Sequence, residues 1–254
     1  MFLSEFGQKV NQAKTLDFGA IFSQSIELFK KVWLQGLITI LISIAAILPL
    51  YCIVYIPLLM IGVDPDIIGQ NEELNVSFLI LIGLFFIAFA IVASSFGIAL
   101  MSAFYRICKQ KDLGESVKDD YFYYFKKAYF LKLMKLSIVG IAISVLASLL
   151  FLLPLFYVMV PISFLTVIFA FNPEARVTDI VKASFKLGNK KWLITFGLML
   201  VCGFLAEIVG MMLCFVGLFA TVSFAYLPLY IIYKEVIGFE NSEEEESVFI
   251  ETTI

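Results

Sequence analysis

The sequence contains no histidine among its 254 residues. This absence excludes histidine-ligated zinc or iron sites, Ser-His and Cys-His catalysis, and histidine proton relays. Cysteine is also sparse, with four residues that form no CxxC pair: Cys52, Cys108, Cys202 and Cys214. Structural disulfides and a zinc site are therefore not expected. The sequence predicts no metal, no cofactor and no enzymatic activity.

Charge is the next scarce property. Charged residues make up 15% of the chain, whereas soluble domains average about 25%. Hydrophobic residues make up 61%, and the mean hydropathy is +0.99. No charged side chain occurs in residues 32–63, 77–105 or 136–173, and only Glu207 interrupts the run from 192 to 233. Because about 20 apolar residues suffice to cross a bilayer, these runs predict an all-α integral membrane protein.

The lengths of these runs predict six transmembrane helices. The first two runs each suit one span, and the first of them is expected to tilt or to kink at Pro49 or Pro57. The last two runs are each long enough for a hairpin, turning near Leu152-Leu153-Pro154 and near Phe215-Val216-Gly217. The whole of residues 1–238 is expected to form one polytopic membrane domain. The predicted spans cover about 33–62, 77–105, 134–153, 154–172, 192–214 and 216–234.

Basic residues indicate the orientation. All 18 lysines and arginines fall on one side of a six-span arrangement that has both termini on that side. Because basic loops resist translocation, this side is expected to be the cytoplasmic face of a bacterial inner membrane. The acidic segment 63–75 then lies outside, and residues 239–254 form an acidic, disordered cytoplasmic tail. A seven-span arrangement would move a basic loop outside and is rejected. The first 19 residues lack the features of a signal peptide, so none is expected.

A lysine pair beside a large aromatic residue occurs three times. Each copy follows a segment with helical apolar spacing and precedes a pair of predicted spans. The sequence therefore predicts three cytoplasmic amphipathic elbow helices and a pseudo-threefold repeat of elbow plus hairpin. The alternative is that the basic joints of any six-span protein give the same pattern. A shift of 96 residues aligns Phe29, Lys30, Lys31 and Trp33 with Phe125, Lys126, Lys127 and Tyr129, and a shift of 159 aligns Ile21, Ser25, Leu28, Lys31 and Trp33 with Ile180, Ser184, Leu187, Lys190 and Trp192.

Two segments carry a resemblance to a known family: LDFGAIFSQSIELFKKVW near the N-terminus and PEARVTDIVKASFKLGNKKWLITFGLML before the last hairpin. They resemble the membrane domain of glycerophosphoryl diester phosphodiesterases and the stand-alone six-span bacterial proteins of that superfamily. The resemblance covers nearly the whole chain and rests on pattern. It implies a membrane architecture without the catalytic barrel, whose chemistry needs a histidine and clustered carboxylates. The resemblance therefore implies no reaction.

Glu207 is the one acidic or basic side chain in the interior of a predicted span, away from the span ends. A charge at the bilayer centre costs roughly 2.5–3.5 kcal/mol on insertion scales. Glu207 is therefore expected to serve as a proton or cation site, to be a neutral acid bonded to a neighbouring helix, or to lie near the wet interface. Gly203 and Gly210 flank it at small-residue spacing, which indicates close helix packing. These three residues form the candidate intramembrane polar site.

The lysine pairs have two interpretations. They bind anionic lipid headgroups, at about 1 kcal/mol for each basic residue, or they only set the topology. The aromatic residues beside them are predicted interfacial anchors, namely Trp33, Tyr129 and Trp192. The candidate anionic-lipid contacts are Lys30, Lys31, Lys126, Lys127, Lys190 and Lys191.

Two functions of different classes follow from these features. The first is a non-enzymatic membrane scaffold or accessory subunit that contacts membrane lipids or another integral membrane protein. It rests on the missing catalytic residues and on the small outer surface. The second is a small transporter or channel that uses Glu207 in the fifth span. No feature of the sequence indicates a nucleic-acid partner.

Overall fold

The computed structural model describes residues 2–60, 76–115, 117–150, 152–213 and 216–239. Within these ranges all regular secondary structure is helical. This is the expected outcome for apolar segments in lipid, because an α-helix satisfies its backbone polar groups within the segment itself. The elements are α1 (Phe2–Gln12), α2 (Phe18–Met60), α3 (Val76–Asp112), the 3₁₀ helix η1 (Tyr123–Phe125), α4 (Lys127–Leu149), α5 (Leu152–Phe171), α6 (Val177–Lys190), α7 (Trp192–Met212), α8 (Val216–Thr221), the 3₁₀ helix η2 (Val222–Tyr226) and α9 (Leu227–Ile237).

Six stretches are long and apolar enough to cross a membrane, which confirms the predicted all-α membrane fold with six spans. Each stretch coincides with one helix, except the last, which combines α8, η2 and α9. The stretches are Phe18–Pro49, Gly83–Asp112, Lys127–Leu149, Pro154–Phe171, Trp192–Met212 and Gly217–Ile237.

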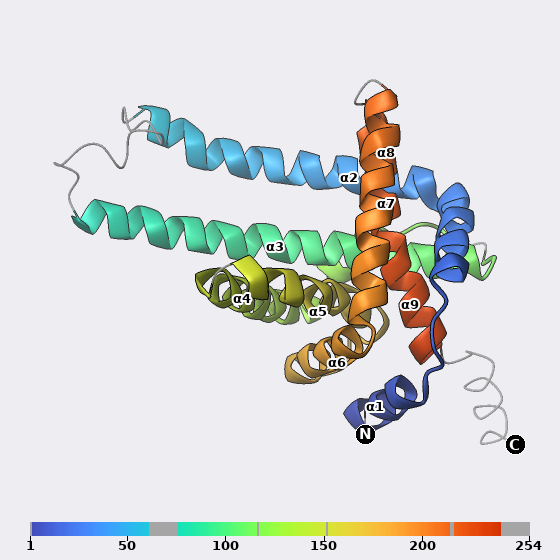
Figure 1. Cartoon of the computed structure of the whole chain (residues 1–254). Helices are drawn as coiled ribbons and strands as arrows, with labels where there is room; N and C mark the ends of the chain where they lie inside the picture. Colours follow the sequence, from blue (N-terminus) through green and yellow to red (C-terminus); the bar gives the residue numbers. More distant parts are fainter. Residues whose placement is uncertain (1, 61–75, 116, 151, 214–215, 240–254) are drawn as a thin grey trace, which may run out of the picture.

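The turns and bends differ in detail from the sequence predictions. α2 continues through Pro49 and Pro57, and Figure 1 shows its most pronounced bend near its N-terminal end. α4 ends at Leu149, slightly before the predicted turn, whereas the second predicted turn lies partly outside the described residues. The last span changes to 3₁₀ geometry before α9, where Pro228 lies in the first turn. Proline lacks the N–H that a continuous α-helix would need there.

Three helical hairpins diverge from a common end (Figure 1). The hairpins are α2–α3, α4–α5 and α7–α8, and the helices of each pack against one another. The tips of α2–α3 and α7–α8 point in different directions, while their opposite ends meet near α6 and α9. We call this common end the polar end (residues 2–35, 105–115, 117–135, 168–192 and 227–239), and we call the outward parts the distal halves (residues 41–60, 76–92, 145–150, 152–157, 200–213 and 216–219).

The centre of the packed core is α9. Every residue from Leu227 to Tyr233 is buried, so this helix is enclosed around its whole circumference. A helix that is apolar on all sides is typical of a buried central position. α3 and α5 contribute large buried rings to the same core, among them Phe104, Tyr105, Phe164 and Phe169. The last helix of the chain therefore joins the ends of the other spans.

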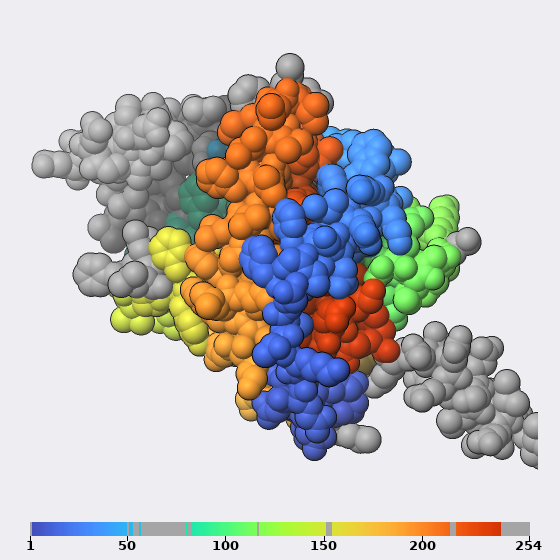
Figure 2. Space-filling view, turned by 45° about the vertical axis from the view of Figure 1, so that its right-hand side comes forward, coloured from blue at the N-terminus to red at the C-terminus, as the bar shows by residue number. Residues whose placement is uncertain are grey.

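Two amphipathic helices cover the polar end. α1 packs against α6 and α9, and Figure 2 shows it beside α9 at the lower edge of the molecule. Phe6 and Val10 are its buried apolar side chains. α6 lies so close to α5 that a Cβ on Gly188 would be 2.8 Å from the Cα of Pro161. Glycine is therefore required at this crossing.

The three elbow helices and their repeat are not confirmed. The third segment forms the separate helix α6, but the first continues without interruption into the span as part of α2. The second, residues 117–126, contains only the short turn η1 and no α-helix. Contacts with other elements explain this difference, because Asp119 pairs with Lys111 and accepts a hydrogen bond from Gln35. Such contacts outweigh the helix preference of a short segment.

Two predicted segments fall largely outside the described residues. The acidic loop 63–75 lies wholly outside them. Of the tail 239–254, only Phe239 is described. The ring of Phe239 lies 4.8 Å from that of Phe171, measured between centroids. The first residue assigned to the tail is therefore packed against the core.

Candidate functional site

Glu207 lies on the exposed face of α7. The buried face of this helix carries Cys202, Ala206 and Gly210, which recur every four residues. Glu207 follows Ala206 directly and so points about 100° away from that face. It lines none of the three cavities described below. A transport role for Glu207 therefore stays a prediction.

The two glycines that flank Glu207 differ in their surroundings. A Cβ on Gly210 would lie 2.8 Å from the Cα of Leu218, so α7 and α8 cross closely at this point. A Cβ on Gly203 would meet nothing within 4 Å. Gly210 is thus a packing residue, as small residues in membrane helices commonly are. Gly203 makes no such crossing, and a polar site that combines both glycines with Glu207 stays a prediction.

Five of the six candidate lipid-contact lysines are exposed, namely Lys30, Lys31, Lys126, Lys127 and Lys190. Lys191, which joins α6 to α7 in the chain, is the exception, because it is buried. Its Nζ donates a hydrogen bond to the backbone carbonyl of Lys14 at 2.8 Å. Burial, and then the charge of Lys190, lower the pKa of Lys191. Lys191 therefore holds the N-terminal segment, and lipid binding by the exposed five stays a prediction.

The predicted interfacial aromatic residues also differ from one another. Trp33 is half-exposed on α2. Trp192 is fixed by two contacts, since its Nε1–H donates to the carbonyl of Tyr157 at 3.0 Å and its ring stacks on Phe196 at 4.8 Å. The hydroxyl of Tyr129 donates to a carboxylate oxygen of Glu174 at 3.5 Å. These contacts do not test whether the three residues anchor the protein at the membrane interface, so that role stays a prediction.

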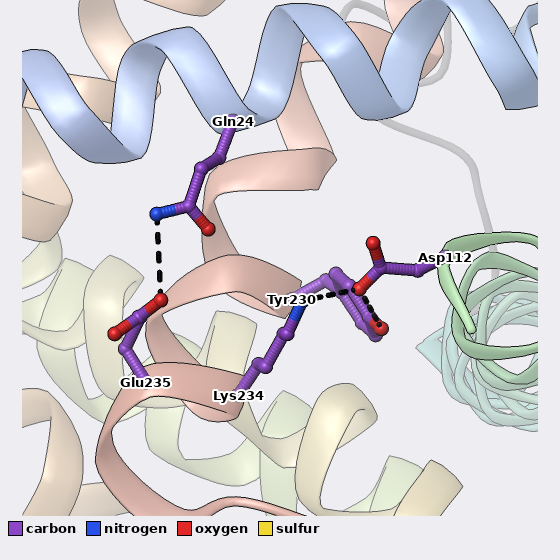
Figure 3. A network of polar contacts seen from close by, with 5 residues as sticks. All are labelled: Gln24, Asp112, Tyr230, Lys234 and Glu235. Atoms are coloured by element: carbon purple, nitrogen blue, oxygen red, sulfur yellow. Dashed lines mark hydrogen bonds and ion pairs between the residues drawn. The ribbon is translucent and has the colours of Figure 1, made fainter.

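A polar network joins three helices at the polar end (Figure 3). Asp112, the last residue of α3, accepts a hydrogen bond from the hydroxyl of Tyr230 at 2.9 Å and pairs with Nζ of Lys234 at 2.7 Å. On the opposite side of α9, Glu235 accepts a hydrogen bond from Nε2 of Gln24 at 3.3 Å. The network fixes α2 and α3 to the central helix.

Sequence reasoning missed this network. Asp112 and Lys234 are 122 positions apart, and no local pattern in the sequence links them. The signal available was the position of Tyr230 and Lys234 one turn apart at the end of the last apolar run, which places both on one helix face. Their partner could not be identified without the three-dimensional arrangement.

A cavity of about 530 Å³ lies between α1, the segment 13–17, α2 and α9. Charged side chains of both signs line it, including Lys9, Lys14, Asp17 and Glu235. Such a mixed lining does not select a ligand of one charge. A second cavity of about 250 Å³ lies between α3, α4 and α5 and is mainly apolar. Among the residues that the structure describes, no cluster of cysteine, aspartate and glutamate could hold a metal ion.

The distal halves carry many exposed large apolar side chains. Leu149 and Met212 lie at the ends of α4 and α7 and are 74% and 79% exposed. The exposed set also includes residues of both helices of α2–α3 and α4–α5, and of α7: Leu48, Ile56, Ile80, Leu84, Ile87, Leu146, Phe156, Phe204 and Met211. Exposed apolar surface of this kind marks contact with lipid or with another protein.

No protein-family model, curated protein or solved structure matches the chain. The resemblance to the membrane domain of glycerophosphoryl diester phosphodiesterases therefore stays a prediction from the sequence.

Proposed function

We propose that this protein is a non-enzymatic membrane scaffold or accessory subunit whose distal halves bind another integral membrane protein within the bilayer. One observation carries the proposal: the packed core lies near the polar end, whereas the distal halves of the three hairpins diverge and expose large apolar side chains. The hairpins thus present separate apolar faces.

The chemistry of the distal halves supports this role. Association of helices in lipid depends on close packing rather than on a hydrophobic driving force. The exposed Leu84, Leu146 and Phe204 are large apolar side chains, so they can pack against the side chains of a partner helix. The lack of histidine in the sequence and the exposed position of Glu207 support a role without catalysis or transport.

Photocrosslinking tests the proposal. A photoreactive residue at Leu84, Leu146 or Phe204 should yield, in cells, an adduct with one protein of discrete mass. Leu131 provides the matched control, because it is an exposed leucine of α4 at the polar end. Adducts with lipid alone at all three distal positions, or equal protein adducts at Leu131, would contradict an accessory-subunit role.

We also infer that the polar end faces the cytoplasm of a bacterial cell, because the basic residues lie on α1, α6 and the ends of the spans that meet there. Single cysteines in a cysteine-free chain test this orientation. An impermeant maleimide should label Asp66→Cys in intact cells and Lys182→Cys only after the membrane is opened. The reverse pattern would invert the proposed topology.

A further inference from the structure

Two cations lie beside one aromatic ring at the polar end. The guanidinium carbon of Arg106, on α3, is 3.8 Å from the ring centroid of Tyr123. Nζ of Lys126, which directly precedes α4, is 4.4 Å from the same centroid. The face of an aromatic ring attracts cations because it carries partial negative charge. Tyr123 therefore holds two like charges from different elements close to each other.

No carboxylate neutralises these two charges in the part of the chain that the structure describes. The ion pairs recorded there all involve other cations. Glu174 is connected to the ring of Tyr123 through Tyr129 and pairs with neither cation. Arg106 is half-buried, and a partly buried charge without a partner is costly. An anion from outside the chain would supply the missing partner.

A third cavity, of about 270 Å³, offers space for this anion between α3, η1 and the end of α5. Arg106 and Tyr123 line it, as does Lys109, which lies one turn further along α3. Lys109 also has no ion pair among the described residues, and its Nζ lies 4.7 Å from the ring centroid of Phe239. Glu115 is the one acidic residue of the lining. Because the cations at and beside the cavity outnumber this carboxylate, the site favours an anion with two charges.

We propose that Arg106, Lys109 and Lys126 bind a dianionic oxyanion, which is the chemistry of inorganic phosphate, sulfate and phosphate monoesters. The planar guanidinium of Arg106 can donate to two oxygens of such an ion at once, and the two ammonium groups add point charges. The cavity volume is just below the range of about 300–1,000 Å³ for ligand pockets, so it suits the oxyanion group rather than a large ligand. This site is separate from the distal halves and does not depend on the scaffold role.

Anions of matched shape test the proposal on the purified full-length protein. Sulfate and perchlorate are both tetrahedral, but sulfate carries one more negative charge. Titration calorimetry at constant ionic strength should give sulfate, and phosphate at about pH 8, an affinity about 10-fold above that of perchlorate, the effect of one additional charged contact. In the lipid arm, nanodiscs offer phosphatidate, a phosphate monoester, against phosphatidylglycerol, a diester, and native mass spectrometry counts the retained lipid.

Variants assign the binding to these cations. Arg106→Gln and Lys126→Gln should each weaken sulfate binding about 10-fold. The matched control is Lys182→Gln, which removes one exposed lysine of α6 and should change affinity less than about threefold. Tyr123→Phe keeps the ring and should bind within about threefold of the wild type. Tyr123→Leu loses the attraction for both cations and should bind about 10-fold more weakly.

The outcomes also separate the sources of the oxyanion. Preference for the dianion in the soluble arm alone identifies a dissolved ion as the ligand, and preference for phosphatidate alone identifies the phosphate group of a lipid. The wild-type protein overturns the proposal, without any variant, if neither arm shows binding that favours the dianion. A loss of affinity in Lys182→Gln as large as that in Arg106→Gln and Lys126→Gln would also overturn it.

Discussion

Two tyrosines three positions apart differ in what their hydroxyl groups contact. Tyr124 is buried against Phe169, and its hydroxyl donates to the backbone carbonyl of Ala170 at 2.5 Å. Tyr121 has a buried hydroxyl without a hydrogen-bond partner in the described structure. Burial raises the pKa of both phenols, and for Tyr121 the pKa reaches about 12, with the nearby Asp119 as the second cause. The hydroxyl group therefore contributes a hydrogen bond at Tyr124 but not at Tyr121.

The substitution Tyr124→Phe should lower the free energy of unfolding by about 1–3 kcal/mol, because it leaves the buried carbonyl of Ala170 without its donor. Tyr121→Phe is the matched control and should leave stability unchanged or slightly higher at neutral pH. Both can be measured by SDS titration followed by circular dichroism. Equal losses for the two variants would show that the hydrogen bond from Tyr124 to Ala170 does not account for the difference in stability.

The pKa of Tyr121 also predicts a pH dependence. A tyrosine in the unfolded chain has a pKa of about 10, so between about pH 10 and pH 12 the folded state holds the proton more tightly. The stability is therefore complete below about pH 10 and decreases as the pH rises toward 12. The wild-type protein should lose stability more steeply than Tyr121→Phe over this range in an alkaline unfolding series. Parallel curves would contradict the raised pKa.

At the scale of elements, Gly210 lies at a close crossing within the α7–α8 hairpin. Gly210→Ala should lower the free energy of unfolding by about 1–3 kcal/mol, because the added Cβ would approach the backbone of Leu218 to 2.8 Å. Gly203→Ala on the same helix meets open space and should be neutral, or stabilising by up to about 1 kcal/mol through helix propensity. Thermal unfolding of both variants in the same detergent provides the comparison. A loss in Gly203→Ala as large as in Gly210→Ala would contradict the assigned crossing.

At the scale of the whole molecule, Asp112 and Lys234 connect α3 to the central helix α9. Asp112→Ala should lower the free energy of unfolding by about 1–3 kcal/mol, because Lys234 loses its charge partner and Tyr230 loses its acceptor. Glu5→Ala breaks the exposed pair with Lys9 within α1 and should cost no more than about 0.5 kcal/mol. Equal effects would show that the Asp112 network adds nothing beyond a surface pair.

The sequence alone predicted the number and type of the membrane spans, because both follow from the local length of charge-free runs and from the need to satisfy backbone groups in lipid. It also indicated a packing role for Gly210. It did not predict the structure of residues 117–126, whose helical spacing was overridden by contacts of Asp119 and Tyr124 with other elements. Apolar spacing can be read from neighbouring residues, whereas contacts such as that of Tyr124 with Ala170 join residues that are far apart in the sequence.

The sequence by itself determined that this protein is helical, lies in a membrane and lacks every histidine-dependent chemistry. Only the tertiary structure decided that α9 is central, that Glu207 faces outward and that Arg106 and Tyr123 line one cavity. The physical reason is that burial of an apolar run in lipid depends on composition alone. The direction in which a side chain points depends on which helices pack together, and residues more than 100 positions apart decide that packing.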